Sequence, residues 1–468
     1  MKTIAVIGGG ISGLTTAWLL AEQIRENGSA CELTVLEQEQ SPGGKIKSVR
    51  EEGFLCEWGP NGFLDNKPQT LELCSALGVS DRLHRSNDNA RKRFIYTGGE
   101  LHRLPENGPS FLKSRMLSWP GKLRLLGEPF AAAPPGGDET LAAFGRRRLG
   151  SEALQKLIAP MASGIFAGDP ETMSLQSCFP RIAELEREYG GLFRAMIVLA
   201  KKKKQERREG KISSSAAGPG GTLTSFREGI QFLTDTLATR LGDRLRTGAT
   251  VVAVVKDGGH WKITLASGDT LSADLIISAA PAYAAADILT TVDAPLVDTL
   301  RQIPYSSLSV VCSGFLTDGL RHPLDGFGYL IPKEEGRTAL GTLWDSSMFE
   351  QRAPAGSALL RSMAGGACRP DLINLTDEQL LQRIREDIKA AMGITVAPCF
   401  SRIIRHQQAI PQYTVGHSKR LEQIEARLAN LPGLLLTGNA FKGVGLNDCV
   451  AASRATAERA MAYLGGVA

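Results

Sequence analysis

A short run of β-branched and apolar residues, Thr3 to Ile7, leads directly into three consecutive glycines. Gly8, Gly10 and Gly13 have the Gly-x-Gly-x-x-Gly spacing, and the apolar residues from Leu14 onward repeat with a helical period. A strand, a tight turn and a helix in this order bring the backbone close to a pyrophosphate at the helix N-terminus. The spacing alone is a weak signal, because glycine-rich turns are common.

A second apolar strand strengthens the prediction of a β-α-β nucleotide-binding unit. It runs from Leu33 to Leu36 and ends in Glu37, which lies 24 residues beyond Gly13. A carboxylate at this place accepts hydrogen bonds from an adenosine ribose. Two more glycine-bearing loops follow, at residues 41–45 and 57–61, where the backbone again has room beside a ligand. Together these features indicate FAD rather than NAD.

The same pattern returns later in the chain, which predicts a discontinuous cofactor domain. A helix is expected over residues 226–241, strands over 250–256, 261–266, 275–278 and 434–437, and a closing helix over 450–464. Residues 85–223 are expected to be mostly helical, and strands are expected at 308–311, 329–331, 340–344 and 359–363. The predicted fold class is α/β plus α, and the predicted domains are a Rossmann-type FAD-binding domain (residues 1–80, 224–295 and 395–468), a mixed-sheet substrate-binding domain (81–120 and 296–394) and an inserted helical domain (121–223).

Composition narrows the function classes. The 468 residues carry a net charge of +5, which is too small to predict nucleic acid binding. The eight cysteines are scattered with no Cys-x-x-Cys pair, so no metal site is expected. No uninterrupted apolar run approaches the ~18 residues that a membrane span requires. The basic run Lys201 to Lys204 precedes a serine- and glycine-rich connector that ends at Gly221. The lysine run is typical of a solvated helix end, and contact with anionic lipid is the alternative interpretation.

The chain resembles the oxygen-dependent protoporphyrinogen oxidases and the related bacterial coproporphyrinogen III oxidases over essentially its full length. Two segments carry this resemblance most specifically, Ser163 to Asp169 and Ala409 to Tyr413. The other segments that carry it are Gly8–Gly13, Pro42–Ile46, Gly59–Asn61, Gly416–His417 and Gly438–Leu446, and the first and the last of these also occur in many flavin amine oxidase relatives.

The resemblance implies a two-lobed flavin fold with an inserted helical domain that, in relatives, lies against the membrane without spanning it. Lys45 replaces an arginine of many relatives, which keeps a positive charge beside the pyrophosphate but loses the bidentate fork. His406 replaces a tryptophan that often lies close to the flavin. The implied FAD contacts are Gly8, Gly9, Gly10, Ile11, Ser12, Gly13, Glu37, Gln38, Lys45, Gly59, Pro60, Asn61, Gly62, Val251, Val444, Gly445 and Leu446.

The resemblance also implies a substrate site. Arg93 matches an arginine that pairs with a porphyrinogen propionate, and the alternative for it is an exposed loop charge beside Arg91 and Lys92. Asn61, beside the flavin by analogy, is expected to hydrogen-bond the pyrrole region. The implied pocket walls are Gly164, Phe166, Gly328, Leu330, Leu343 and Met363, which by sequence alone resemble any core strand.

The implied reaction is the FAD-dependent oxidation of protoporphyrinogen IX to protoporphyrin IX in heme biosynthesis, with dioxygen reduced to hydrogen peroxide. Hydride transfer from a methylene bridge to flavin N5 is the expected step, and three cycles complete the porphyrin. Coproporphyrinogen III is the alternative substrate, favoured by Lys67 and the connector before Gly221. An amine oxidase is less expected, because Val444 and Leu446 are aliphatic where an aromatic wall is usual, and a non-catalytic prenyl-protein binding module is less expected still. The chain is expected in the cytoplasm, free or against the inner face of the cell membrane, as a monomer or a homodimer.

Overall fold

The computed structural model describes residues 1–134, 136–208 and 221–466. A five-stranded sheet with the order β10-β2-β1-β14-β20 lies at its centre, and every neighbouring pair in it is parallel. Its inner strands are buried on both faces, which explains their continuous apolar sequence. The strands are β1 (Lys2–Ile7), β2 (Cys31–Leu36), β10 (Leu245–Arg246), β14 (Leu275–Ser278) and β20 (Leu434–Leu436).

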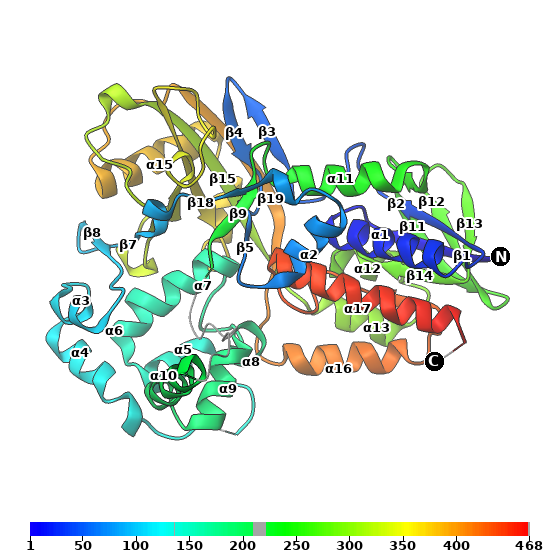
Figure 1. Ribbon diagram of the computed structural model, residues 1–468, viewed down its shortest axis with the longest axis horizontal. Helices are drawn as coiled ribbons and strands as arrows, with labels where there is room; N and C mark the ends of the chain where they lie inside the picture. Colours follow the sequence, from blue (N-terminus) through cyan, green and yellow to red (C-terminus); the bar gives the residue numbers. More distant parts are fainter. Residues whose placement is uncertain (135, 209–220, 467–468) are drawn as a thin grey trace.

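Both faces of this sheet are covered, as the predicted Rossmann-type fold requires (Figure 1). Both ends of the chain lie in this lobe. One face packs against four helices: α1 (Ile11–Glu26), α2 (Pro68–Ala76), α11 (Gln231–Leu241) and α17 (Leu446–Leu464). The other face packs against the antiparallel strands β11 (Val251–Asp257), β12 (His260–Leu265) and β13 (Thr270–Ala273) and the helices α12 (Ala282–Ile288), α13 (Ala294–Arg301) and α16 (His417–Leu428).

The helix predicted from residue 226 begins later than expected. Leu223–Phe226 is strand β9, which pairs with β5 (Phe63–Leu64) and β6 (Leu83–Arg85). Gly229 has a φ of +107°, so the chain turns there before α11 begins at Gln231. A short apolar run does not distinguish a buried strand from a helix, and the two partner strands determine the outcome.

A seven-stranded sheet forms the second lobe, in the order β19-β15-β18-β17-β16-β7-β8. Helix α15 (Asp377–Met392) covers one face, where Val311, Tyr329, Trp344 and Leu360 are buried. The hairpin of β3 (Ser48–Glu51) and β4 (Phe54–Glu57) packs on the opposite face. The strands are β7 (Arg93–Thr97), β8 (Glu100–Arg103), β15 (Tyr305–Leu316), β16 (Gly328–Leu330), β17 (Ala339–Trp344), β18 (Ser357–Gly365) and β19 (Phe400–Pro411).

Two details of this region differ from the expectations. Strand β19 pairs with β15 over most of its length, so the segment from residue 395 begins in the seven-stranded sheet and not in the cofactor lobe. Strands β7 and β8 form a hairpin within residues 85–223, which were expected to be mostly helical, although residues 81–120 were expected in the mixed-sheet domain. Both β19 and β7 pair with a strand that is distant in the sequence, β15 and β16 respectively.

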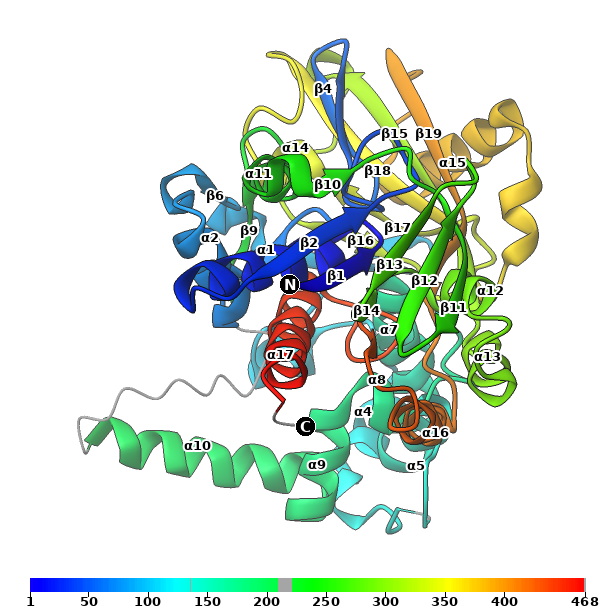
Figure 2. The same cartoon turned by 90° about the vertical axis from the view of Figure 1, so that its right-hand side faces the viewer.

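Short helices form the third region, at the lower left of Figure 1, and begin at Gly108 rather than at residue 121. Helix α10 extends away from the body in Figure 2 and contains Lys201 to Lys204. Most of the predicted connector, residues 209–220, lies outside the described residues. No helix within the described ranges is long and apolar enough to cross a membrane. The helices are α3 (Gly108–Lys113), α4 (Trp119–Leu126), α5 (Leu141–Arg148), α6 (Ser151–Ala153), α7 (Ala159–Phe166), α8 (Leu175–Cys178), α9 (Pro180–Tyr189) and α10 (Leu192–Arg208).

Candidate cofactor and substrate site

The glycine turn lies at the carboxyl edge of the parallel sheet, where β1 and β14 are neighbours. Gly8 has a φ of +105°, and a Cβ there would lie 3.2 Å from the backbone of Ala279, which follows β14. A Cβ on Gly13 would lie 1.8 Å from the Gly8 carbonyl oxygen. By contrast, Gly10 faces open space, and α1 begins after it with no side-chain cap. The turn therefore leaves free N–H groups and room for an anion at the helix N-terminus.

Glu37 is held in place beside this turn. Its carboxylate accepts hydrogen bonds from the Gly9 N–H at 2.5 Å and from the Glu39 N–H at 2.8 Å, and its side chain is buried. The Ala249 N–H donates to the Glu37 carbonyl at 2.8 Å, which brings the start of β11, with Val251, beside it. Gln38 is exposed. The remaining lone pairs of the Glu37 carboxylate fit a ribose diol.

Lys45 contacts the second lobe. Its Nζ donates to the carbonyl of Gln408 at 2.5 Å and to that of Ala409, and it lies 5.5 Å from the centroid of the Tyr305 ring. Burial lowers the pKa of Lys45 to about 8. Two carbonyl groups of β19 already accept hydrogen bonds from this ammonium group. Contact between Lys45 and a pyrophosphate therefore stays a prediction. Nε2 of the nearby His406 lies 2.9 Å from the carbonyl oxygen of Trp58.

The loop from Gly59 to Gly62 passes between the two lobes. A Cβ on Gly59 would lie 2.6 Å from the Lys45 carbonyl oxygen, and a Cβ on Gly62 would lie 2.2 Å from that of Thr224. Both glycines are therefore required by backbone packing. Asn61 is 7% exposed, and its Nδ2 donates to Asp345 Oδ1 at 3.1 Å. Within the described residues its Oδ1 has no hydrogen-bond partner.

The N-terminus of α17 is another helix start in the cofactor lobe that has no side-chain cap. Gly445 caps α17 without a side-chain hydrogen bond, Leu446 is buried, and Val444 packs against the helical region. The Ser453 hydroxyl of α17 donates to the Ser12 carbonyl of α1 at 3.0 Å. These helix starts, after Gly10 and after Gly445, therefore belong to helices that are packed together.

The predicted pocket walls lie on one face of the seven-stranded sheet. Gly328 pairs with Leu343, and Leu330 pairs with Gly341, whose other partner is Met363. Because partners in register point to the same side, these residues share the face opposite to α15. Gly164 of α7 packs on this wall, since a Cβ there would lie 2.9 Å from Leu330 Cδ2.

Phe166 differs from the other predicted wall residues. Its ring is buried in the helical region, with centroids 5.8 Å from Phe179 and 6.0 Å from Tyr413. Its carbonyl accepts a hydrogen bond from Gln412 Nε2 at 2.8 Å. The structure therefore places the Phe166 ring in a hydrophobic core.

Arg93 lies at the edge of the wall, in register with Gly328. Its two neighbours are paired, Arg91 with Asp88 at 2.9 Å and Lys92 with Asp325. Arg93 has no acidic partner among the residues described, and its guanidinium lies 5.1 Å from the centroid of the Phe327 ring. Desolvation lowers the pKa of Arg93, although the residue is exposed overall. It is thus a cation available for a carboxylate.

Sequence reasoning missed a group of four buried charges behind Asn61. Arg352 lies 2.9 Å from Glu57, and Arg361 lies 2.9 Å from Asp345. Burial raises the pKa of Glu57, and the charge of Arg352 opposes this rise. Nothing in the sequence signals that these residues meet, because Glu57 is almost 290 positions from Asp345.

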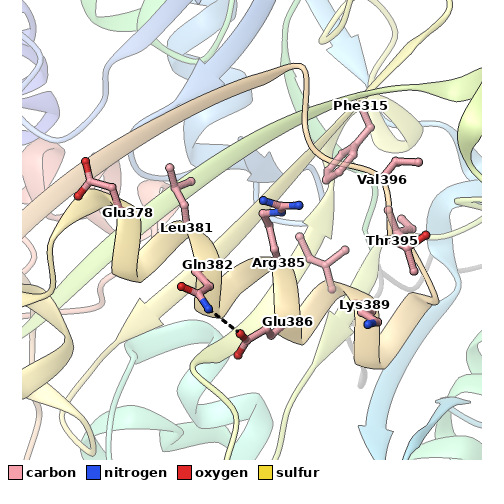
Figure 3. Close-up of a pocket in the computed structure, with 11 residues that line it drawn as sticks. Phe315, Glu378, Leu381, Gln382, Arg385, Glu386, Lys389, Thr395 and Val396 are labelled. Carbon is pink, nitrogen blue, oxygen red and sulfur yellow. Dashed lines mark hydrogen bonds between the residues drawn. The ribbon is translucent and has the colours of Figure 1, made fainter.

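A surface hollow of about 570 Å³ lies along α15, on the other side of the seven-stranded sheet (Figure 3). Its charged side chains carry both signs, and a hydrogen bond of 3.2 Å joins Gln382 to Glu386. None of the predicted site residues lines it. The glycine turn, the loop at Asn61 and the wall therefore describe the candidate site better than this hollow.

Comparison with known proteins identifies the family. The profile of the flavin containing amine oxidoreductases matches residues 11–461. The chain belongs to this family. The cofactor of this flavin amine oxidoreductase is FAD, and the open space at Gly10, the uncapped helix starts and the tethered carboxylate of Glu37 fit it.

Full-length relatives of this flavin amine oxidoreductase are similar over nearly the whole chain. The coproporphyrinogen III oxidase of Bacillus subtilis is 30% identical, over 99% of this chain and 98% of that protein. The protoporphyrinogen oxidase of Homo sapiens is 32% identical, over 97% and 98%. A solved structure from Exiguobacterium sp. 255-15, described as a candidate protoporphyrinogen oxidase, is 26% identical with a TM-score of 0.83 over 98% of each chain. A UDP-galactopyranose mutase at 18% identity and a TM-score of 0.74 shares the fold.

Proposed function

We propose that this flavoprotein oxidises a porphyrinogen to a porphyrin, with protoporphyrinogen IX as the preferred substrate, dioxygen as the electron acceptor and hydrogen peroxide as the second product. The observation that carries the proposal is Arg93, a cation without an acidic partner among the described residues, at the edge of an apolar wall. A large, flat, apolar ring with carboxylate side chains matches both features. The names of the full-length relatives support the same substrate class.

The residues of the chain bind and orient the substrate in this proposal. Leu330, Leu343 and Met363 hold one face of the macrocycle, and Arg93 pairs with a propionate. FAD, when bound, would supply the two-electron redox chemistry between the macrocycle and dioxygen in each cycle. The macrocycle loses two hydrogens each time, and three cycles remove six electrons in all. Asn61 lies in the loop from Gly59 to Gly62, beside the wall. In this proposal its side chain hydrogen-bonds the pyrrole region of the substrate.

Coproporphyrinogen III is the second candidate, and the similarity to the Bacillus subtilis enzyme favours it. It carries four carboxylates, so it needs more cations than protoporphyrinogen IX, which carries two. Lys67 was the cation expected to serve it. In the structure its Nζ is 2.6 Å from Asp448 Oδ1, in the first turn of α17. This pairing reduces the support that Lys67 gives to coproporphyrinogen III.

Each porphyrinogen, prepared anaerobically, is offered separately to the purified holoprotein in air while porphyrin fluorescence and peroxide are followed. The expected result is faster porphyrin formation from protoporphyrinogen IX than in a control without enzyme. A strong preference for coproporphyrinogen III would reverse the substrate assignment. No porphyrin from either compound, with FAD bound, would refute the proposal and favour oxidation of an amine.

We further propose that the helical region rests on a lipid surface. Trp119, Leu123 and Phe130, in and beside α4, are 66%, 65% and 90% exposed. Apolar side chains grouped in this way are typical of interfacial contacts. Co-sedimentation with anionic vesicles tests the idea. Serine at these three positions should release the protein, and binding that is unchanged would contradict it.

A further inference from the structure

The Asn61 amide is held by a carboxylate that is itself fixed. Asp345 follows β17 and is fully buried, and its Oδ1 accepts from Asn61 Nδ2 at 3.1 Å. Its Oδ2 lies 2.9 Å from Nε of Arg361, which is also buried. With one oxygen against the Arg361 guanidinium and the other accepting from Nδ2, the Asp345 carboxylate faces the NH₂ side of the amide. The amide of Asn61 therefore has one orientation, with its carbonyl oxygen away from Asp345.

Arg361 also fixes the backbone that carries Asn61. Its Nη1 donates to the carbonyl of Gly59 at 2.8 Å and to that of Glu57 at 3.3 Å. Glu57 is held in turn by Arg352 and by the Ile230 N–H at 3.0 Å. Two arginines balance two carboxylates, so each buried charge of the cluster has a counter-ion that offsets its desolvation. Its effect is to anchor both the amide and the loop beneath it.

The cluster lies beside the proposed substrate wall, on the same face of the sheet. Arg361 pairs in register with Leu343, Asp345 is two residues beyond Leu343, and Met363 is two residues beyond Arg361. With a period of two, Leu343, Arg361 and Met363 share the face of the sheet opposite to α15, and Asp345, just beyond the end of β17, reaches this face through its contact with Arg361. The Asn61 oxygen has no partner among the described residues, although the side chain is more than nine-tenths buried. A buried acceptor without a partner costs free energy unless a ligand supplies a donor.

We propose that Asp345 is a positioning residue that presents the Asn61 carbonyl oxygen to a pyrrole N–H of the substrate. This inference rests on the proposed function. When a methylene bridge loses a hydride, for which FAD would be the acceptor, positive charge develops on the adjacent pyrrole nitrogen and its N–H becomes a stronger donor. The oriented oxygen stabilises that charge, and the proton then leaves to solvent. An amide free to rotate would present its NH₂ group half of the time, and that group repels a cationic N–H.

A double-mutant cycle tests the proposal with Asn61→Ala, Asp345→Asn and the double variant. The rate of anaerobic flavin reduction is measured at saturating protoporphyrinogen IX and coproporphyrinogen III. Each single variant should lower the limiting rate about tenfold to a hundredfold, the range for a hydrogen bond to a charged group. In the absence of Asn61 the second change should alter the rate by less than about twofold. Losses that multiply, or a full rate in Asp345→Asn, would overturn the proposal.

Two further variants keep the result interpretable. Thr342→Val removes a buried hydrogen bond of 2.8 Å to Ser362 on the α15 side of the same strand. It should lower the melting temperature and leave the limiting rate unchanged. Asp345→Asn could fail to retain FAD because it leaves Arg361 without its counter-ion. In that case the combined variant Asp345→Asn, Arg361→Gln, which removes both charges, replaces Asp345→Asn in the double-mutant cycle.

The two proposals fail in different ways. Wild-type flavin that neither porphyrinogen reduces would overturn the proposed function, and this inference with it. Wild-type flavin that is reduced, in a cycle whose losses multiply, would overturn only the role of Asp345.

Discussion

Replacing Gly10 with alanine separates the cofactor role of the glycine turn from its packing role. Gly10 has a φ of −76°, which any residue adopts, and a Cβ there meets no atom of the protein within 4 Å. The apoprotein should therefore fold normally, with a stability change of at most about 1 kcal/mol for alanine at an N-cap. With FAD bound, the added methyl group points into the space assigned to the pyrophosphate.

The expected cost is that of overpacking a close contact, about 1–3 kcal/mol. The dissociation constant of FAD should therefore rise about fivefold to 150-fold. The assay is a titration of the apoprotein with FAD, followed by quenching of flavin fluorescence, beside chemical denaturation without FAD. Wild-type affinity in Gly10→Ala would refute the placement of the pyrophosphate at this helix start.

Two comparison variants sharpen the test. Gly108→Ala adds a methyl group to open space at the start of α3, far from the turn. It should change neither the dissociation constant of FAD nor the stability of the apoprotein by much. Gly13→Ala places a Cβ 1.8 Å from the Gly8 carbonyl oxygen, so it should lower stability even without FAD. A Gly13→Ala apoprotein as stable as the wild type would contradict the packing role of that glycine.

Arg93→Met should raise KM for the porphyrinogen about tenfold or more, through loss of a hydrogen bond to a charged group, with the FAD spectrum unchanged; an unaltered KM in steady-state assays would argue against propionate binding. Arg352→Met leaves Glu57 buried without its cation and should lower the free energy of unfolding by about 3–5 kcal/mol in denaturant titrations; a loss below about 1 kcal/mol would count against the ion pair. Burial lowers the pKa of His417 from 6.5 to about 4, so the unfolded chain takes up a proton first and stability should fall as the pH drops from 6.5 to 4. His417→Phe keeps the ring stack with Tyr413 and should flatten this part of the profile, whereas an unchanged slope would exclude His417 as its source.

The cofactor side of the site could be predicted from the sequence because its chemistry depends on the backbone. A turn that only glycine fits, a helix start and a carboxylate at the end of β2 are local features with fixed spacing. They predicted Gly8 to Gly13 and Glu37 at the carboxyl edge of a parallel sheet, where the structure places them. Side-chain placement was harder to predict, since Lys45 turns to the carbonyls of β19.

The substrate side depends on register, which a single sequence does not encode locally. Strand β19 was assigned to the wrong lobe because its partner, β15, is about a hundred residues earlier in the chain. The four charges near Asn61 come from β4, β18 and the segment between β17 and β18, and each is an ordinary charged residue in its own sequence context. Only the pairing of β17 with β18 brings Asp345 to Arg361.

The two segments that most specifically carried the resemblance meet each other in the structure. Gln412 donates to the Phe166 carbonyl, and Tyr413 packs against the Phe166 ring. The end of α7 is thereby fixed to the end of β19. Because Gly164 lies two residues before Phe166 and packs on Leu330, this joint sets how closely the helical region approaches the wall. If the wall binds substrate as proposed, Phe166 acts on it only through the position of α7, and Phe166→Leu should alter substrate affinity together with stability rather than affinity alone.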